Sequence, residues 1–154
     1  MNLCSYWRAV LAQDADGMRA FLAPDAVVRW PNTRERFTAE EFIRVNCAYP
    51  GAWKGGLERV EYAGDVAICV VLVQSADDAQ SLHAVSFLRL HGDRIVQIDE
   101  YWSDDGPVPP WRTKLLAGGL LQSSQSDLRC EQTRDARSSA QNADVCEERY
   151  PGND

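Results

Sequence analysis

The alternation of apolar and polar residues predicts helices early in the chain. Residues 6–11 carry apolar side chains at helical spacing, and a second short helix is predicted over 18–22. The stretch 26–30 is rich in β-branched and aromatic residues, which predicts a strand that ends at Pro31. Residues 32–36 are polar, so we expect a loop there.

A third helix and a series of strands follow. Thr38 and Glu41 have the spacing of a capping box, so we expect a helix from Thr38 to about Ala48. Long stretches of strand character separated by short turns then predict a curved antiparallel sheet, with strands over 57–62, 66–75, 81–90 and 95–102. Helices followed by strands in this order indicate an α+β fold.

The last predicted strand carries an unusual combination of side chains. Alternation places Val96, Ile98, Glu100 and Trp102 on one face, so the Glu100 carboxylate lies among apolar groups. Desolvating a carboxylate costs several kcal/mol unless it is paired or protonated. Glu100 is therefore either a satisfied structural group or a group that performs chemistry.

Composition and charge narrow the class of protein. Of the 154 residues 45% are hydrophobic and 25% are charged, which is typical of a globular domain. The net charge of −7 argues against nucleic acid and anionic membranes as partners, and no apolar run is long enough to span a membrane. The five scattered cysteines include no CxxC pair, which suits neither a zinc site nor a disulfide framework, so we expect a reducing, cytoplasmic location and no metal. No GxGxxG motif or phosphate loop occurs, and we expect no cofactor.

The composition changes after residue 116. We expect one folded domain over 1–116 and a disordered C-terminal tail over 117–154, where polar and charged residues dominate and apolar periodicity is absent.

An ordered set of motifs resembles a known superfamily. The motifs lie between Leu3 and Arg112 and are Trp30-Pro31-Asn32-Thr33 with Glu35 and Phe37, Tyr49-Pro50-Gly51 with Trp53, Ser86-Phe87, Glu100-Tyr101-Trp102 and Trp111-Arg112. This set is similar to the nuclear transport factor 2-like superfamily, close to its SnoaL-like (polyketide-cyclase-like) domains. The resemblance implies a cone-shaped fold, in which a strongly curved antiparallel or mixed β-sheet wraps around N-terminal helices and encloses a pocket.

The resemblance also implies a range of functions. Members include ketosteroid isomerases, cyclases, dehydratases and hydrolases, and others only bind ligands or form dimers through the sheet. In ketosteroid isomerases an aspartate precedes a proline at the end of the first strand, whereas here Trp30 precedes Pro31. In the cyclase branch an acid on a late strand transfers the proton with a histidine nearby; by strand and neighbourhood the matching residues here are Glu100 or Asp99 and His83.

The candidate catalytic residues are Glu100, Glu35 and His83, and each also has a structural interpretation. Glu100 is a general acid or base, or else it bonds an arginine or a tryptophan N–H and braces the fold. Glu35, in the loop after the first strand, acts as a base or pairs with a neighbouring arginine. His83 shuttles protons or is an ordinary packed or surface histidine.

The candidate ligand-binding residues are mostly aromatic. Asn32 orients a ligand carbonyl or makes a local turn bond. The aromatic residues line an apolar pocket or belong to the core and a dimer interface; they are Trp30, Phe37, Tyr49, Trp53 and Trp102.

Two functions remain open from the sequence. The first is a cofactor-free domain that binds a small apolar organic molecule and, if it is an enzyme, catalyses isomerisation, cyclisation, dehydration or hydrolysis by proton transfer. The second is a non-catalytic ligand-binding or homodimerisation module of the same fold.

Overall fold

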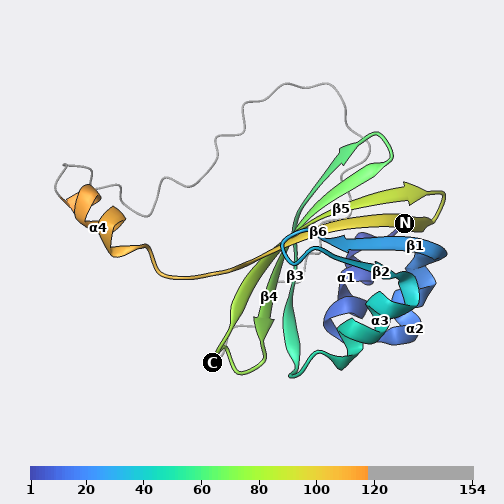
Figure 1. Cartoon of the computed structure of the whole chain (residues 1–154), viewed down its shortest axis with the longest axis horizontal. Helices are drawn as coiled ribbons and strands as arrows, with labels where there is room; N and C mark the ends of the chain where they lie inside the picture. The colour runs from blue at the N-terminus through green and yellow to red at the C-terminus, as the bar shows by residue number, and fades with distance from the viewer. Residues whose placement is uncertain (118–154) are drawn as a thin grey trace, which may run out of the picture. The chain divides into compact units, whose positions relative to one another are not determined.

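The computed structural model describes residues 1–117, which fall into two compact units that divide after Asp105. The first unit contains three helices and six strands (Figure 1). Its elements in chain order are α1 (Leu3–Leu11), α2 (Ala15–Phe21), β1 (Leu22–Trp30), β2 (Glu35–Thr38), α3 (Ala39–Ala48), β3 (Trp53–Ala63), β4 (Val66–Ser75), β5 (Ser81–His91) and β6 (Arg94–Asp104).

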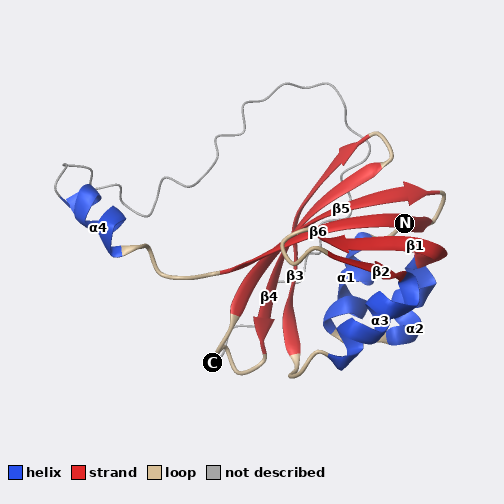
Figure 2. Ribbon diagram, viewed as in Figure 1, coloured by secondary structure: helices blue, strands red, loops and turns tan. Residues whose placement is uncertain are grey.

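The six strands form one curved mixed sheet in the order β2-β1-β6-β5-β4-β3. Neighbouring strands are antiparallel except β1 and β6, which pair in parallel although they are far apart in sequence. Figure 2 shows α1, α2 and α3 gathered on one face of this sheet. The expected α+β architecture, a curved mixed sheet with helices at the N-terminus, is confirmed.

The core lies between the helices and the inner face of the sheet. Side chains that are almost completely buried come from both layers, including Tyr6 and Trp7 of α1 and Phe42 of α3. Along β5 the inner positions Ala84, Ser86 and Leu88 are buried, and the residues between them are not. This alternation is expected for a sheet that packs on one face only.

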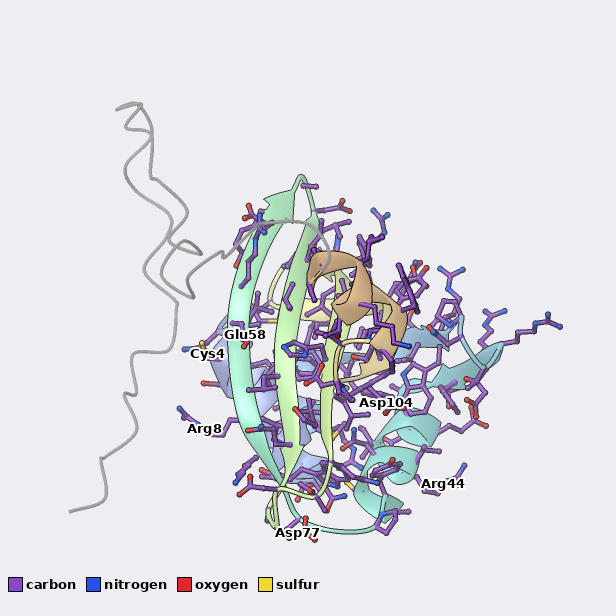
Figure 3. All side chains as sticks on the ribbon, turned by 90° about the vertical axis from the view of Figure 1, so that its left-hand side faces the viewer. Cys4, Arg8, Arg44, Glu58, Asp77 and Asp104 are labelled. Atoms are coloured by element: carbon purple, nitrogen blue, oxygen red, sulfur yellow. The ribbon has the colours of Figure 1, made fainter. Side chains whose placement is uncertain are left out.

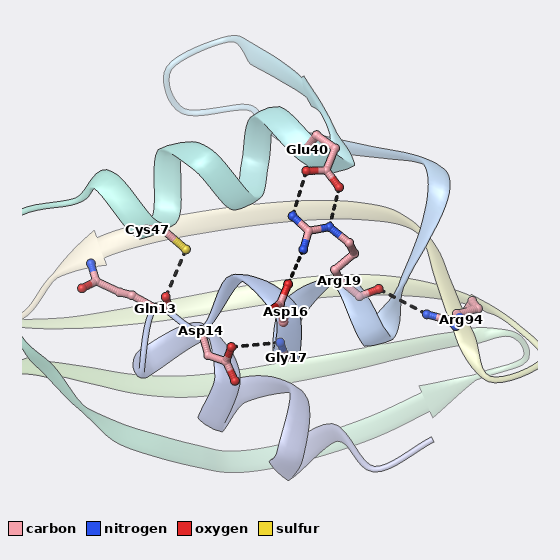
Figure 4. Close-up of polar contacts among 8 residues, drawn as sticks. All are labelled: Gln13, Asp14, Asp16, Gly17, Arg19, Glu40, Cys47 and Arg94. Atoms are coloured by element: carbon pink, nitrogen blue, oxygen red, sulfur yellow. Dashed lines mark hydrogen bonds and ion pairs between the residues drawn. The ribbon is translucent and has the colours of Figure 1, made fainter.

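Polar contacts fix the helices to one another (Figure 4). The Arg19 guanidinium of α2 contacts Glu40 of α3 at 2.7 Å and Asp16 at 2.6 Å. The Cys47 thiol of α3 donates to the carbonyl oxygen of Gln13 at 3.1 Å. The predicted capping box at the start of α3 is confirmed, because Thr38 and Glu41 bond each other's backbone N–H groups.

A bulge in β6 modifies the predicted alternation. The register moves from Arg89 opposite Gln97 to Leu90 opposite Ile95, which leaves Val96 as the extra residue. Ile95 and Ile98 are therefore both fully buried, whereas Val96 is half-buried. From Ile98 onward the predicted alternation holds, and Glu100 lies on the inner face.

Several sequence-based boundaries were wrong, including that of the helix predicted over 18–22, which is α2 (Ala15–Phe21). The expected loop over 32–36 contains the start of β2, which pairs with β1 across a short turn. The strand predicted over 26–30 begins at Leu22, because a register shift between Leu22 and Val27 accommodates Pro24 and Asp25. The strand predicted over 57–62 begins four residues earlier, at Trp53.

The second unit contains α4 (Pro110–Ala117) within the described residues. The predicted disordered tail lies outside the described residues, apart from Ala117. None of the described helices has the length and apolar character needed to cross a membrane. Nowhere in residues 1–117 do three or more His, Cys, Asp or Glu side chains gather as a metal site would require.

Candidate functional site

Glu100 is a buried carboxyl group with three hydrogen-bond donors. Its side chain is 1% exposed. The indole N–H groups of Trp30 and Trp102 both donate to Oε2, each at 2.9 Å, and the Ser86 hydroxyl donates to Oε1 at 2.7 Å. The carboxyl group therefore joins two indoles and a hydroxyl in one cluster.

The sheet register brings these groups together. Ser86 on β5 lies directly opposite Glu100 on β6, and Ala84 lies opposite Trp102, where its small side chain leaves room for the indole. The parallel pairing of Arg29 with Asp99 places the next residue of β1, Trp30, beside Glu100. The donors therefore come from three adjacent strands.

Burial and hydrogen bonding act on Glu100 in opposite directions. Loss of solvent raises the pKa of the Glu100 carboxyl, and the bonds from Ser86, Trp30 and Trp102 partly offset that rise. The Tyr6 hydroxyl is also fully buried and has no hydrogen-bond partner among the described residues. Its pKa is raised by burial and by the nearby Glu100.

The indoles of Trp30 and Trp102 also line a cavity of about 270 Å³. Its lining is mostly apolar and combines residues of α1, the β1–β2 turn, α3 and the sheet: Val10, Leu11, Gln13, Trp30, Asn32, Thr33, Glu35, Val45, Asn46, Tyr49, Trp53, Val73, Leu82 and Trp102. Glu100 is not among the lining residues. The buried carboxyl group thus accepts hydrogen bonds from two indoles of the cavity wall without lining the cavity itself.

The indole N–H groups around the cavity already have acceptors. Trp30 and Trp102 donate to Glu100, and Trp53 donates to the carbonyl oxygen of Pro50 at 3.2 Å. They are therefore poorly placed to polarise an oxygen of a bound molecule. The exposed Asn32 side chain makes no hydrogen bond within the described chain and is better placed for that role.

Among the described residues that line the cavity, Glu35 is the one with a carboxyl group. It is the first residue of β2, at the solvent-exposed end of the β1–β2 turn. The Thr33 hydroxyl donates to Glu35 Oε2. No hydrogen bond engages Oε1 within the described residues, so this oxygen is available to a bound molecule.

His83 lies on the opposite face of the sheet from the cavity. Its Nδ1 is 2.6 Å from Asp105 Oδ1, and its Nε2 is 3.2 Å from Glu58 Oε2. Glu58 is on β3, the strand at the edge of the sheet (Figure 3). The Asp105 hydrogen bond, followed by the charges of both carboxylates, raises the pKa of His83. The structure does not bring His83 together with Glu100 or Glu35.

The aromatic candidates divide into two groups. Trp30, Tyr49, Trp53 and Trp102 line the cavity, and the rings of Tyr49 and Trp53 are 5.3 Å apart. Phe37 does not line it. Its ring meets the edge of Trp30 at a centroid distance of 4.9 Å, which supports that indole.

Sequence reasoning missed the contribution of the helices to the cavity. Gln13, just after α1, donates from Nε2 to the carbonyl oxygens of Asn46 and Tyr49, at 3.1 and 2.6 Å, and so fixes the end of α3. These contacts join residues more than 30 positions apart. The only local signal is the interruption of helical periodicity after Leu11, which marks a turn without indicating what it contacts.

The fold defines the class of protein. It is similar to that of a nuclear transport factor 2-like protein of unknown function from Burkholderia xenovorans, which is 21% identical, with a TM-score of 0.59 and coverage of 71% of this chain and 86% of that chain. The model of the SnoaL-like domain matches residues 5–98, so this chain belongs to the SnoaL-like family.

Two further solved structures are similar. A candidate ketosteroid isomerase from Kribbella flavida is 26% identical, with a TM-score of 0.61 and coverage of 73% of this chain and 82% of that chain. An epoxide hydrolase from M. tuberculosis is 13% identical, with a TM-score of 0.54 and coverage of 64% of this chain and 77% of that chain. Among curated proteins, none matches this sequence.

Proposed function

We propose that this SnoaL-like domain binds a small, mostly apolar organic molecule in the cavity between α1, α3 and the sheet. The observation that carries the proposal is the cavity itself, about 270 Å³ with a largely aromatic and aliphatic wall. Small-molecule sites combine such walls with a few polar groups that fix the orientation of the ligand. Asn32 and Glu35 supply those groups at the exposed side.

We further propose that Glu35 is the proton-transferring group if the bound molecule reacts. It lines the cavity and has one oxygen without a partner in the described chain, which suits a general base. Glu100 acts behind the wall, as a positioning residue for Trp30 and Trp102. The similar structures named above include a candidate ketosteroid isomerase and an epoxide hydrolase. Enzymes of both kinds move protons to or from an organic molecule, and this supports proton-transfer chemistry.

Binding is tested by filling the cavity. Leu82 lines the cavity, whereas Val85, three residues later on the same strand, points to the opposite face of the sheet. Titration of tryptophan fluorescence with apolar ligands such as 1-indanone should show saturable binding to the wild type and to Val85→Trp, and little binding to Leu82→Trp. Equal binding by the two variants would place the ligand elsewhere.

Catalysis is tested with the same ketone in D2O. If Glu35 removes a proton from carbon, the wild type should accelerate deuterium exchange at the α-carbon of bound 1-indanone, as followed by NMR. Glu35→Gln should bind the ketone and lose the acceleration. Binding without any acceleration by the wild type would favour a non-catalytic binding domain.

A specific observation also favours the second candidate function, a homodimerisation module. On the outer face of the sheet, Phe87 is 37% exposed and Tyr101 is 44% exposed, and their rings meet edge to face at 6.1 Å. Exposed aromatic residues are frequent at interfaces between chains. Phe87→Glu should then convert a dimer to a monomer in size-exclusion chromatography, and a wild type that is monomeric at high concentration would contradict this proposal.

A further inference from the structure

The cavity is rich in aromatic rings and poor in charged side chains. Three indoles and the Tyr49 ring line it. Of the described residues that line it, none is Lys, Arg or His, and Glu35 is the one acidic residue. A pocket of this composition has a negative electrostatic potential. Binding of a neutral apolar molecule by the hydrophobic effect would not require such a potential.

The orientation of the indoles strengthens this bias. The N–H edge is the positive part of an indole ring, and the electron-rich faces are negative. In Trp30 and Trp102 the N–H edge is bonded to Glu100, which does not line the cavity. In Trp53 the N–H bonds a carbonyl oxygen. None of these positive edges is therefore free to bond a molecule in the cavity.

A second carboxyl group lies behind the wall. Glu100 is within hydrogen-bond distance of two indoles that line the cavity, so a negative charge there would lie close to a bound ligand. Glu35 lies at the exposed side of the same cavity. A positive group bound in the cavity would therefore be attracted by both carboxyl groups.

We propose that the cavity selects organic cations, with an alkylammonium group held against the indoles, over neutral or anionic molecules of the same shape. This inference rests on the proposed function and specifies its ligand class. Cations bind to aromatic faces through the ring quadrupole, and quaternary ammonium groups are suited to this because they carry a diffuse charge and have no N–H that needs an acceptor. An anion would lack a basic partner and would be repelled by Glu35.

The test uses three probes of similar shape and different charge. They are phenyltrimethylammonium, the neutral tert-butylbenzene and the anionic benzenesulfonate. Titrations of tryptophan fluorescence with the full-length protein should give a dissociation constant for the cation about tenfold lower than for the neutral compound. Benzenesulfonate should bind more weakly than both.

Charge-removing variants separate the site from the general charge of the protein. Glu35→Gln should reduce the preference for phenyltrimethylammonium severalfold and leave the binding of tert-butylbenzene nearly unchanged. Glu58→Gln, which removes the same charge from the outer face of the sheet, should leave both dissociation constants as they are.

Two outcomes would overturn the inference. If tert-butylbenzene binds as tightly as the cation, or Glu35→Gln and Glu58→Gln behave alike, the cavity does not select cations, although the proposed binding function stands. If none of the probes binds, and Leu82→Trp binds 1-indanone as the wild type does, the proposed binding function fails together with the inference.

Discussion

Replacing Glu100 with alanine should destabilise the domain strongly. The substitution leaves two indole N–H groups and the Ser86 hydroxyl without their acceptor, in a place where the carboxyl group is 1% exposed. Each buried polar group left unpaired costs about 1 kcal/mol or more, and the lost side-chain volume adds to this. The sum is about 4 kcal/mol, a large part of the stability of a domain of this size.

Replacing Glu100 with glutamine should have a much smaller effect. The amide oxygen can accept both indole N–H groups, and the amide nitrogen can donate to the Ser86 hydroxyl, so the three bonds keep partners. The neutral amide also avoids the cost of burying a charge. We therefore expect Glu100→Gln to stay within about 1 kcal/mol of the wild type at neutral pH.

The wild type and Glu100→Gln should differ in pH dependence. Because burial raises the pKa of Glu100 in the folded state, the folded protein binds this proton more tightly than the unfolded chain does. The contribution of Glu100 to stability is then full below its unfolded pKa, about 4.3, and decreases as pH rises through the folded pKa. The stability of the wild type relative to Glu100→Gln should therefore fall as pH rises.

Urea denaturation followed by tryptophan fluorescence measures all three proteins, since Trp30 and Trp102 report on the cluster directly. The free energy of unfolding of Glu100→Ala should be about 4 kcal/mol lower than that of the wild type. An alanine variant as stable as the wild type would refute the bracing role. A constant difference between the wild type and Glu100→Gln from about pH 4 to 8 would refute the raised pKa.

Three further perturbations test the fold, each by urea denaturation. Gly55→Ala should lower the free energy of unfolding by about 2 kcal/mol or more, because the φ of Gly55 is +137° and a Cβ there would clash with the Leu72 carbonyl oxygen. Gly56→Ala is the control and should change the free energy little, because no heavy atom lies within 4 Å of a Cβ at that position. Thr38→Ala should cost about 1 kcal/mol by removing the cap of α3; no loss would mean that tertiary contacts alone hold its first turn. His83→Gln should destabilise the protein more at pH 5.5 than at pH 9. The pKa of His83 is raised in the folded state, so its contribution to stability is present below the unfolded pKa and is lost as pH rises through the folded pKa. Equal losses of stability at pH 5.5 and pH 9 would contradict the ion pairs.

Local patterns in the sequence determined most of the elements. The capping box identified the start of α3, and β4 has the boundaries that its β-branched residues predict, Val66–Ser75. β2 was missed because residues 35–38 have little strand character of their own and become a strand by pairing with β1. The motif resemblance identified the SnoaL-like family, which the family match over residues 5–98 confirms.

The sequence also indicated that Glu100 faces inward, and it named four of the aromatic residues that line the cavity. Only the tertiary structure decided that Glu100 lies behind the cavity wall while Glu35 lines the cavity, and that His83 is on the other face of the sheet. Alternation along a strand specifies which face of the sheet a side chain occupies, because the face depends only on residues adjacent in the sequence. What the side chain meets there depends on the pairing of residues about 70 positions apart, such as Arg29 with Asp99, and no local pattern records that pairing.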